Sequence, residues 1–281
     1  MPSYFSDFED AASYAFESLK HSGAMVDAGR WQGVPTEGKP DLQTKELLDL
    51  QFNVNLERAS WHDPIRETYV ETLAREIHPN LPWADEHFAE RIGGLPLNPD
   101  PSYKNWPWWR GQEAAAMSAG YQTKFTHTYS ERFWPKQAGR YTLDRGALRA
   151  AHGIRYPYGD YGDVLDLLAR EPHTRQAYLP IFFPEDTGAV HGGRIPCSLG
   201  YHFLLRGNRL HCWYDIRSCD AVRHFRDDLY LAARLVDHTL TELVDRELHG
   251  DAEQLWVDVN PGILFFKCHS FHVHMGDYHL L

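Results

Sequence analysis

One stretch of the chain, residues 194–230, combines a thiol with groups that bind a phosphate. Cys197 follows a proline and opens an aromatic-rich run, and Arg217, Ser218 and Asp220 follow about twenty positions later. An arginine fork beside a hydroxyl suits a phosphate monoester, and a nearby cation raises the thiolate fraction of a cysteine. The stretch therefore suggests a nucleophile that acts on a phosphorylated small molecule, although a cysteine in a strand more commonly serves as a small apolar core residue.

Two strands joined by a tight turn must bring these groups together. The apolar run from Leu199 to Phe203 predicts the first strand, and Leu210 to Ile216 predicts the second. The Gly207-Asn208 pair between them is typical of a hairpin turn. Apolar residues at helical spacing over 228–248 then predict a long helix. In such a hairpin the cysteine before the first strand lies beside the arginine after the second.

The rest of the chain alternates predicted helices with strand-like runs. Apolar spacing predicts helices over residues 4–20, 64–78, 83–92 and 160–170, and strands over 47–56, 178–183 and 263–274. Residues 21–41 are rich in glycine and proline and predict a loop that contains Arg30.

The Pro-Cys pair at 196–197 and the Arg-Ser-x-Asp run at 217–220 together resemble the thymidylate synthase superfamily, and the Gly-Asn hairpin matches as well. The resemblance covers roughly residues 85–280, with gaps. It implies a thymidylate-synthase-like α/β fold, in which a mixed sheet is faced by helices and a homodimer forms through the sheet. The whole chain, 1–281, would be one such domain with a divergent N-terminal region of about 1–84.

The resemblance also implies catalytic roles. Cys197 would attack a pyrimidine ring, and a helical glutamate would order water and move protons. Glu86 and Glu90 lie four positions apart, on one face of the predicted helix, and Glu90 is preferred because it adjoins the Gly-Gly turn. Tyr129 matches the active-site tyrosine loosely, because the neighbouring Gly, Gln and Arg of that segment are not kept. Without the resemblance, both glutamates are simply solvated helix carboxylates.

Phosphate contacts follow from the same resemblance. Arg217 and Ser218, with Asp220 beside them, would hold the nucleotide, and Arg30 would cap its phosphate from the N-terminal loop. Arg175 would reach the phosphate site of the other protomer across the dimer interface. The second arginine of that segment is replaced by glutamine in this chain.

Sugar contacts are expected from His272 and His274, which alternate on the last predicted strand and so share a face. They match a His-x-Tyr pair that holds the ribose in the superfamily, with His in place of Tyr. A His-x-His pair on a strand could instead bind a metal, but the sequence offers no obvious third ligand, so no metal is expected.

Trp106 and Trp109 keep the spacing of a tryptophan pair that lies where folate meets the substrate in the superfamily. The resemblance thereby implies methylenetetrahydrofolate as the one-carbon donor. The alternative for these tryptophans is a hydrophobic cluster under a loop.

The residue at the position that selects the base differs from the one in thymidylate synthases. Their asparagine, eleven positions after the arginine, pairs with uracil, and here that position is Asp228. An ionised carboxylate cannot donate to O4 of uracil, but it accepts from the amine of cytosine, and a protonated one can serve N3. A mismatch leaves a buried group unpaired and costs about 1–3 kcal/mol. Asp227 is the neighbouring candidate, and either carboxylate could instead cap the helix.

The expected activity is therefore the folate-dependent 5-hydroxymethylation of CMP or dCMP, as in cytidylate hydroxymethylases of nucleoside-antibiotic pathways and of phages. His for Tyr on the sugar face slightly favours CMP. Thymidylate synthase activity, hydroxymethylation of dUMP, and a non-catalytic nucleotide-binding module are the alternatives.

Composition limits the partners and the compartment. The net charge of −11 argues against a general nucleic-acid surface. The sequence shows no apolar run long enough for a bilayer and no signal-peptide pattern, so a cytoplasmic protein without membrane contact is expected. The four cysteines show no metal-type pairing and are expected to be reduced thiols.

Overall fold

The structure is a computed structural model that describes most of the chain. The described residues are 2–31, 34–62, 67–108, 125–138, 159–187 and 195–281.

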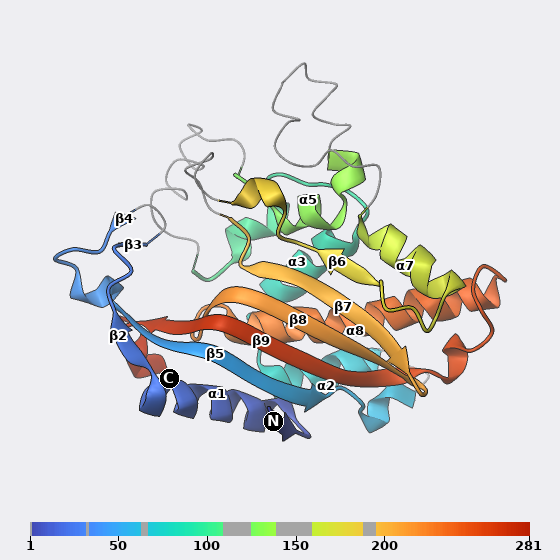
Figure 1. Cartoon of the computed structure of the whole chain (residues 1–281), viewed down its shortest axis with the longest axis horizontal. Helices are drawn as coiled ribbons and strands as arrows, with labels where there is room; N and C mark the ends of the chain where they lie inside the picture. The colour runs from blue at the N-terminus through green and yellow to red at the C-terminus, as the bar shows by residue number, and fades with distance from the viewer. Residues whose placement is uncertain (1, 32–33, 63–66, 109–124, 139–158, 188–194) are drawn as a thin grey trace, which may run out of the picture.

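One mixed seven-stranded sheet organises the described chain, in the order β1-β5-β9-β8-β7-β6, with β2 paired to β5 (Figure 1). The central pair, β8 and β9, is parallel, whereas β5 with β9 and β7 with β8 are antiparallel. The strands are β1 (Ser3–Phe5), β2 (Ala24–Val26), β5 (Thr44–Asn55), β6 (Tyr178–Pro180), β7 (Ser198–Arg206), β8 (Arg209–Asp220) and β9 (Asn260–His274). The predicted α/β class is confirmed.

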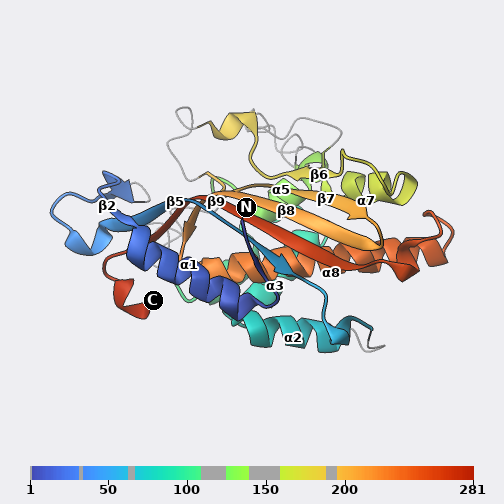
Figure 2. The same ribbon diagram turned by 60° about the horizontal axis from the view of Figure 1, so that its bottom comes forward.

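Helices cover one face of this sheet (Figure 2). The long α8 (Phe225–Leu248) crosses under the central strands, and α1 (Phe8–Ser22), α2 (Glu67–Ile77) and α3 (Trp83–Ile92) pack around it. The shorter α5 (Tyr129–Phe133) packs against α3, and α7 (Tyr161–Arg170) packs against α8 and β6. None of the described helices has the length and apolarity needed to cross a membrane.

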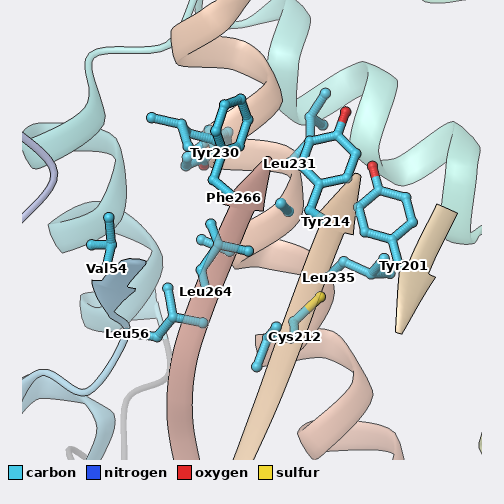
Figure 3. Close-up of a cluster of buried hydrophobic side chains, with 14 of the residues drawn as sticks. Val54, Leu56, Tyr201, Cys212, Tyr214, Tyr230, Leu231, Leu235, Leu264 and Phe266 are labelled. Carbon is cyan, nitrogen blue, oxygen red and sulfur yellow. The ribbon is translucent and has the colours of Figure 1, made fainter. Parts of the chain in front are cut away.

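Strict alternation along the central strands builds the core. Cys212 and Tyr214 of β8, with Leu264 and Phe266 of β9, are buried toward the helices, where they meet Leu231 and other apolar residues of α8 (Figure 3). Burial of each large apolar side chain contributes about 1.5–3 kcal/mol. The other face of these strands is only half-buried and carries the stacked rings of Trp213 and Phe265, whose centroids lie 4.0 Å apart.

The predicted hairpin is present, with Gly207 at a φ of +61° in its turn. The helix after it begins at Phe225, three residues before the predicted start, and its N-cap is His224. Asp227 and Asp228 therefore lie inside the first turns of α8, and the alternative of a capping role is wrong for both.

The N-terminal segment contains more structure than the predicted loop. Arg30 belongs to β3 (Arg30–Trp31), which pairs with β4 (Val34–Pro35) as a separate two-stranded sheet. The backbone pairing of Arg30 with Pro35 overrides the loop signal of the surrounding glycines and prolines.

Candidate active site

Cys197 and Arg217 are brought together by the hairpin as predicted. Cys197 lies immediately before β7, and its carbonyl accepts a hydrogen bond from the backbone N–H of Arg217 at 2.8 Å. The guanidinium of Arg217 donates from Nε to the carbonyl of Pro196 (2.8 Å) and from Nη2 to that of Ile195 (3.0 Å). Nη2 also lies 3.9 Å from the Cys197 sulfur. The arginine thus fixes the segment that carries the thiol and places a positive charge beside it.

Cys197 differs from the other three cysteines in exposure. It is half-buried, whereas Cys212, Cys219 and Cys268 are buried under the sheet. Burial raises the pKa of each of these three thiols well above its usual range. Cys197 is therefore the cysteine that is exposed enough to act as a thiolate nucleophile, whereas burial keeps the other three thiols protonated.

Tyr129 reaches the same place from α5. Its hydroxyl oxygen accepts a hydrogen bond from the backbone N–H of Ser198, the residue after the thiol, at 3.4 Å, and the side-chain hydroxyl oxygens of Tyr129 and Ser198 lie 3.2 Å apart. The Ser198 hydroxyl also bonds the hydroxyl of Tyr214 at 2.8 Å. Burial, followed by the proximity of Cys197, raises the pKa of Tyr129, so its phenol is neutral. The structure thus places the Tyr129 hydroxyl against Ser198, the residue next to the candidate nucleophile.

Asp228 joins this network from α8 below the sheet. Its carboxyl group accepts from the Tyr214 hydroxyl at 3.3 Å and from the Cys219 thiol at 3.5 Å. Burial raises the pKa of Asp228 to about 7, with Arg91 acting in the opposite direction and Asp227 adding to the rise. Tyr214 and Ser198 therefore connect a buried, readily protonated carboxyl group to the surroundings of Cys197.

Asp227 has a different partner. Its two carboxylate oxygens accept from the backbone N–H (2.7 Å) and the side-chain amide (2.8 Å) of Asn80. These bonds tie α8 to the turn before α3 and occupy both oxygens. Of the two neighbouring carboxylates, Asp228 is the one whose hydrogen bonds lead toward Cys197, through Tyr214 and Ser198.

Glu86 and Glu90 share one side of α3, as the spacing predicts, and both hold the 3-10 turn Pro101–Asn105. Glu90 is half-buried and accepts from the N–H of Ser102 at 2.6 Å and from its hydroxyl. Glu86 is exposed and accepts from the Asn105 amide at 2.7 Å. The visible role of both carboxylates is to fix the segment that carries Trp106.

Trp106 lies over the connection between β8 and α8. Its ring stacks on His224, with centroids 4.9 Å apart, and is tilted against Trp83 at 6.1 Å. The neighbouring Trp108 ring lies 5.4 Å from the guanidinium carbon of Arg223. The predicted aromatic loop is thus next to the site, and its other expected member, Trp109, lies outside the described residues.

Asp220 and the two histidines meet because β8 pairs with β9. The register places Asp220 beside His272, and His274 Nε2 lies 3.9 Å from the Asp220 carboxylate. The three side chains offer ligand atoms within 4.8 Å of one another, the spacing of a metal site. However, the Arg223 guanidinium, which pairs with Asp277, also lies 3.7 Å from the same carboxylate and weakens the negative charge that a metal ion would meet there. The cluster is better suited to hydrogen bonding with a polar ligand.

The remaining phosphate-binding candidates are spread out. Ser218 lies half-buried on β8, in register with Ser270 of β9. Arg175 is exposed, and its carbonyl accepts from His202 Nε2 at 3.1 Å, five residues along β7 from Cys197. At about 3.3 Å per residue, the backbone positions of His202 and Cys197 are roughly 16 Å apart. Arg175 therefore does not join the site within one protomer.

Two side chains of the network were missed at the sequence level. His87 and Arg91 follow Trp83 on α3 at intervals of four residues, and all three are buried. The His87 ring packs edge-on against Tyr129, with centroids 6.0 Å apart. The buried face of α3, whose period of four residues is visible in the sequence, was the available signal.

Two hollows in the described surface lie elsewhere. One, of about 390 Å³, is bordered by α1 and the C-terminal Leu280 and Leu281. The other lies between α7 and Arg246 of α8. Neither is bordered by Cys197 or Asp228, so the candidate site rests on the arrangement of its side chains.

Comparison with known proteins adds no family to this picture. No protein-family model matches the chain, and no curated protein is significantly similar to it in sequence.

We expect Cys197 to be alkylated before the other cysteines. Iodoacetamide at pH 8, followed by peptide mass spectrometry, should label Cys197 in the folded protein and the three buried thiols only after unfolding. Arg217→Met should slow this labelling several-fold, because the cation beside the sulfur favours the thiolate. Equal labelling of Cys212 in the folded protein would contradict the assignment.

Asp228→Asn should stabilise the protein increasingly as pH rises. The folded carboxyl group has a pKa of about 7 against 3.8 in the unfolded chain, so between these values only the unfolded state has lost the proton. Stability of the native protein then falls from about pH 4 to pH 7, by at most about 4 kcal/mol for a shift of this size.

Urea unfolding at pH 5 and pH 8 measures this difference. Asp166→Asn is the control, because Asp166 is an exposed carboxylate in a surface ion pair with Arg246, and loss of such a pair changes stability by at most about 1 kcal/mol. A gain for Asp228→Asn that is equal at both pH values would show that the buried carboxyl group is not the cause.

Proposed function

We propose that this protein is a folate-dependent 5-hydroxymethylase of a cytidine monophosphate. The observation that carries the proposal is the buried carboxyl group of Asp228, connected through Tyr214 and Ser198 to the surroundings of Cys197. A thiol nucleophile and a carboxyl reader of a pyrimidine edge are the two groups that this reaction requires of the protein.

In the proposed reaction, the Cys197 thiolate adds to C6 of the pyrimidine and makes C5 nucleophilic. Methylenetetrahydrofolate would supply the one-carbon unit. C5 would take up this carbon and lose its proton to the proposed relay Glu90, and tetrahydrofolate would be the leaving group. Water adds to that carbon, the bond between C6 and the sulfur breaks, and 5-hydroxymethyl cytidylate leaves.

Glu90 is the proposed relay for protons and water, in preference to the exposed Glu86. Arg217 and Ser218 would bind the phosphate, with Arg30 as the cap.

His272 and His274, beside Asp220, would bind the sugar, and Trp106 with Trp109 would border the folate. CMP and dCMP both remain candidates, and the half-buried His272 is the group that would meet the 2′ position.

Base selection follows from the charge of Asp228. The ionised carboxylate accepts from the cytosine amine but repels O4 of uracil. The protonated acid donates to N3 of cytosine and accepts from its amine, yet it can also donate to O4 of uracil. A pKa of about 7 therefore makes discrimination against uracil sharper above neutral pH than below it.

A homodimer through the sheet is part of the proposal. The half-buried face that carries Trp213 and Phe265 would be covered by a second copy. Arg175, exposed and far from Cys197 in its own chain, would then complete the partner's phosphate site. We place the reaction in the cytoplasm, where methylenetetrahydrofolate and nucleoside monophosphates are available.

Incubation with methylenetetrahydrofolate and CMP, dCMP, UMP or dUMP, followed by mass spectrometry, tests the proposal. We expect a hydroxymethyl group on CMP or dCMP, and Cys197→Ala should reduce its formation by at least about a thousandfold. Cys212→Ala is the matched control, because that thiol is buried in the core. A methyl group on dUMP would identify a thymidylate synthase, and binding without any product would identify a nucleotide-binding module.

Asp228→Asn should exchange the base preference. The asparagine amide donates to O4 and its oxygen accepts from N3–H, so uracil nucleotides should gain and cytosine nucleotides should lose about 1–3 kcal/mol in relative kcat/KM. Competition between CMP and UMP, or dCMP and dUMP, measures this ratio directly. Asp227→Asn should leave it unchanged, because Asp227 is bound to Asn80. Retention of the cytosine preference in Asp228→Asn would disprove the reader assignment.

A further inference from the structure

Arg91 is a deeply buried cation with an unusual set of neighbours. Only 3% of the residue is exposed, and it forms no ion pair with any described carboxylate. Its Nη2 donates to His87 Nε2 at 3.0 Å, and its Nη1 lies 3.5 Å from the Tyr201 hydroxyl. The guanidinium carbon lies 4.0 Å from the centroid of the Tyr129 ring, and Nε has no hydrogen-bond partner in the described chain.

Two other arginines with little exposure are paired directly with a carboxylate. The buried Arg132 contacts Asp186 at 2.7 Å, and the part-buried Arg58 contacts Glu76 at 2.6 Å. An unpaired buried charge is costly, so the position of Arg91 requires a compensating group nearby.

His87 fixes the orientation of Arg91. A guanidinium only donates, so His87 Nε2 must accept, and the proton of the neutral ring is on Nδ1. Nδ1 faces Glu90 Oε2 at 3.5 Å and Asp100 Oδ2 at 3.8 Å. Burial, followed by Arg91, lowers the pKa of His87 to about 4, so the ring stays neutral.

The same tautomer disfavours a metal ion between His87, Glu90 and Asp100. A metal would need the Nδ1 lone pair, and the proton would then move to Nε2, where it would face the N–H of Arg91. The cluster is therefore a support for the arginine.

Asp228 lies at the other end of the same network. Tyr201 stacks on Tyr214 with centroids 4.5 Å apart, and the two hydroxyls lie at the same end of the pair (Figure 3). Tyr214 in turn donates to Asp228. Burial acts to lower the pKa of Arg91, but Tyr201, Tyr129, Tyr214 and Asp228 together raise it.

The groups that face Asp228 come from every element packed around it. They are Arg91 from α3, Asp227 from α8, Tyr214 and Cys219 from β8, Tyr201 from β7, Tyr129 from α5 and Cys268 from β9. Among them, Arg91 is the cation.

We propose that Arg91 is a positioning residue of the candidate site: it is the counter-charge of Asp228, and it supports the Tyr129 ring whose hydroxyl meets Ser198 beside Cys197. The inference rests on the proposed function only for the role of Asp228 as base reader. The balance of charge between α3 and α8 stands on its own.

The first test is the titration of Asp228. Infrared difference spectra identify its carboxyl band as the one lost in Asp228→Asn, and the midpoint is followed with pH. Arg91→Gln removes the charge and retains a donor for His87 Nε2, so the midpoint should rise by about one pH unit or more. Arg91→Lys keeps a positive charge and should remain closer to the native midpoint.

Arg58→Met is the control, because it breaks a part-buried pair on another part of the fold and should leave the midpoint unchanged. An unchanged midpoint in folded Arg91→Gln overturns the proposal. If that variant does not fold by near-ultraviolet circular dichroism, Arg91→Met carries the same expectation.

A second test uses stability alone. At pH 8, where Asp228 is ionised, Arg91→Gln should destabilise the native protein more than it destabilises the Asp228→Asn protein. If the losses in free energy of unfolding of the two single variants add up to that of the double variant, the counter-charge role of Arg91 is overturned, whichever reaction the protein catalyses.

Measurement of product formation separates this inference from the proposed function. If the native protein is active, the Arg91→Gln variant should convert UMP as well as CMP, or dUMP as well as dCMP, at pH 8, because Asp228 then stays protonated. Absence of any product with native protein refutes the hydroxymethylase proposal, while the titration and the cycle still decide the role of Arg91.

Discussion

The burial of the Asp228 carboxyl group under the central strands is the constraint on which the site depends. An ionised carboxylate in that position is costly unless hydrogen-bond donors and a cation surround it. Tyr214 and Cys219 supply the donors, and Arg91 supplies the nearby positive charge. Because these groups come from β8 and α3, the position of one carboxyl group ties α8 to both the sheet and a second helix.

The chain connections explain how few segments are needed to build the site. α8 starts five residues after β8 ends, so the residues at the strand end and those of the first helical turns are close in space. The hairpin between β7 and β8 then places Cys197 beside Arg217, and the parallel β8–β9 pair places His272 beside Asp220. Long-range pairing in the sheet thus converts a short sequence motif into a cluster of groups from several elements.

Local sequence patterns predicted the elements well and the long-range contacts poorly. The two apolar runs and the Gly-Asn turn between them predicted the hairpin, and apolar spacing predicted helix 83–92 with its observed bounds. The choice between Asp227 and Asp228 could not be made from the sequence, because it depends on a bond to Asn80, 147 residues away.

Arg91 was missed for a related reason. Arginine on a helix is usually solvated, and only the packing of α3 against α5 and α8 shows that this one is buried. The two carboxylates of α3 that the resemblance singles out, Glu86 and Glu90, hold the turn Pro101–Asn105, whereas the charge that faces the site comes from Arg91 on the buried side of the helix.

The charges near Cys197 also bear on whether one protomer is sufficient. The protein carries a net charge of −11, and at physiological salt this repulsion is screened beyond about 8 Å, so a nucleotide phosphate depends on close contacts. Arg217 already spends its Nε and Nη2 donors on backbone carbonyls. The single positive charge of Arg217, with its remaining N–H donors, neutralises a phosphate dianion only in part. Arg30 and the Arg175 of a second copy are the proposed sources of the missing charge, and the second of these ties the proposed dimer to the proposed reaction.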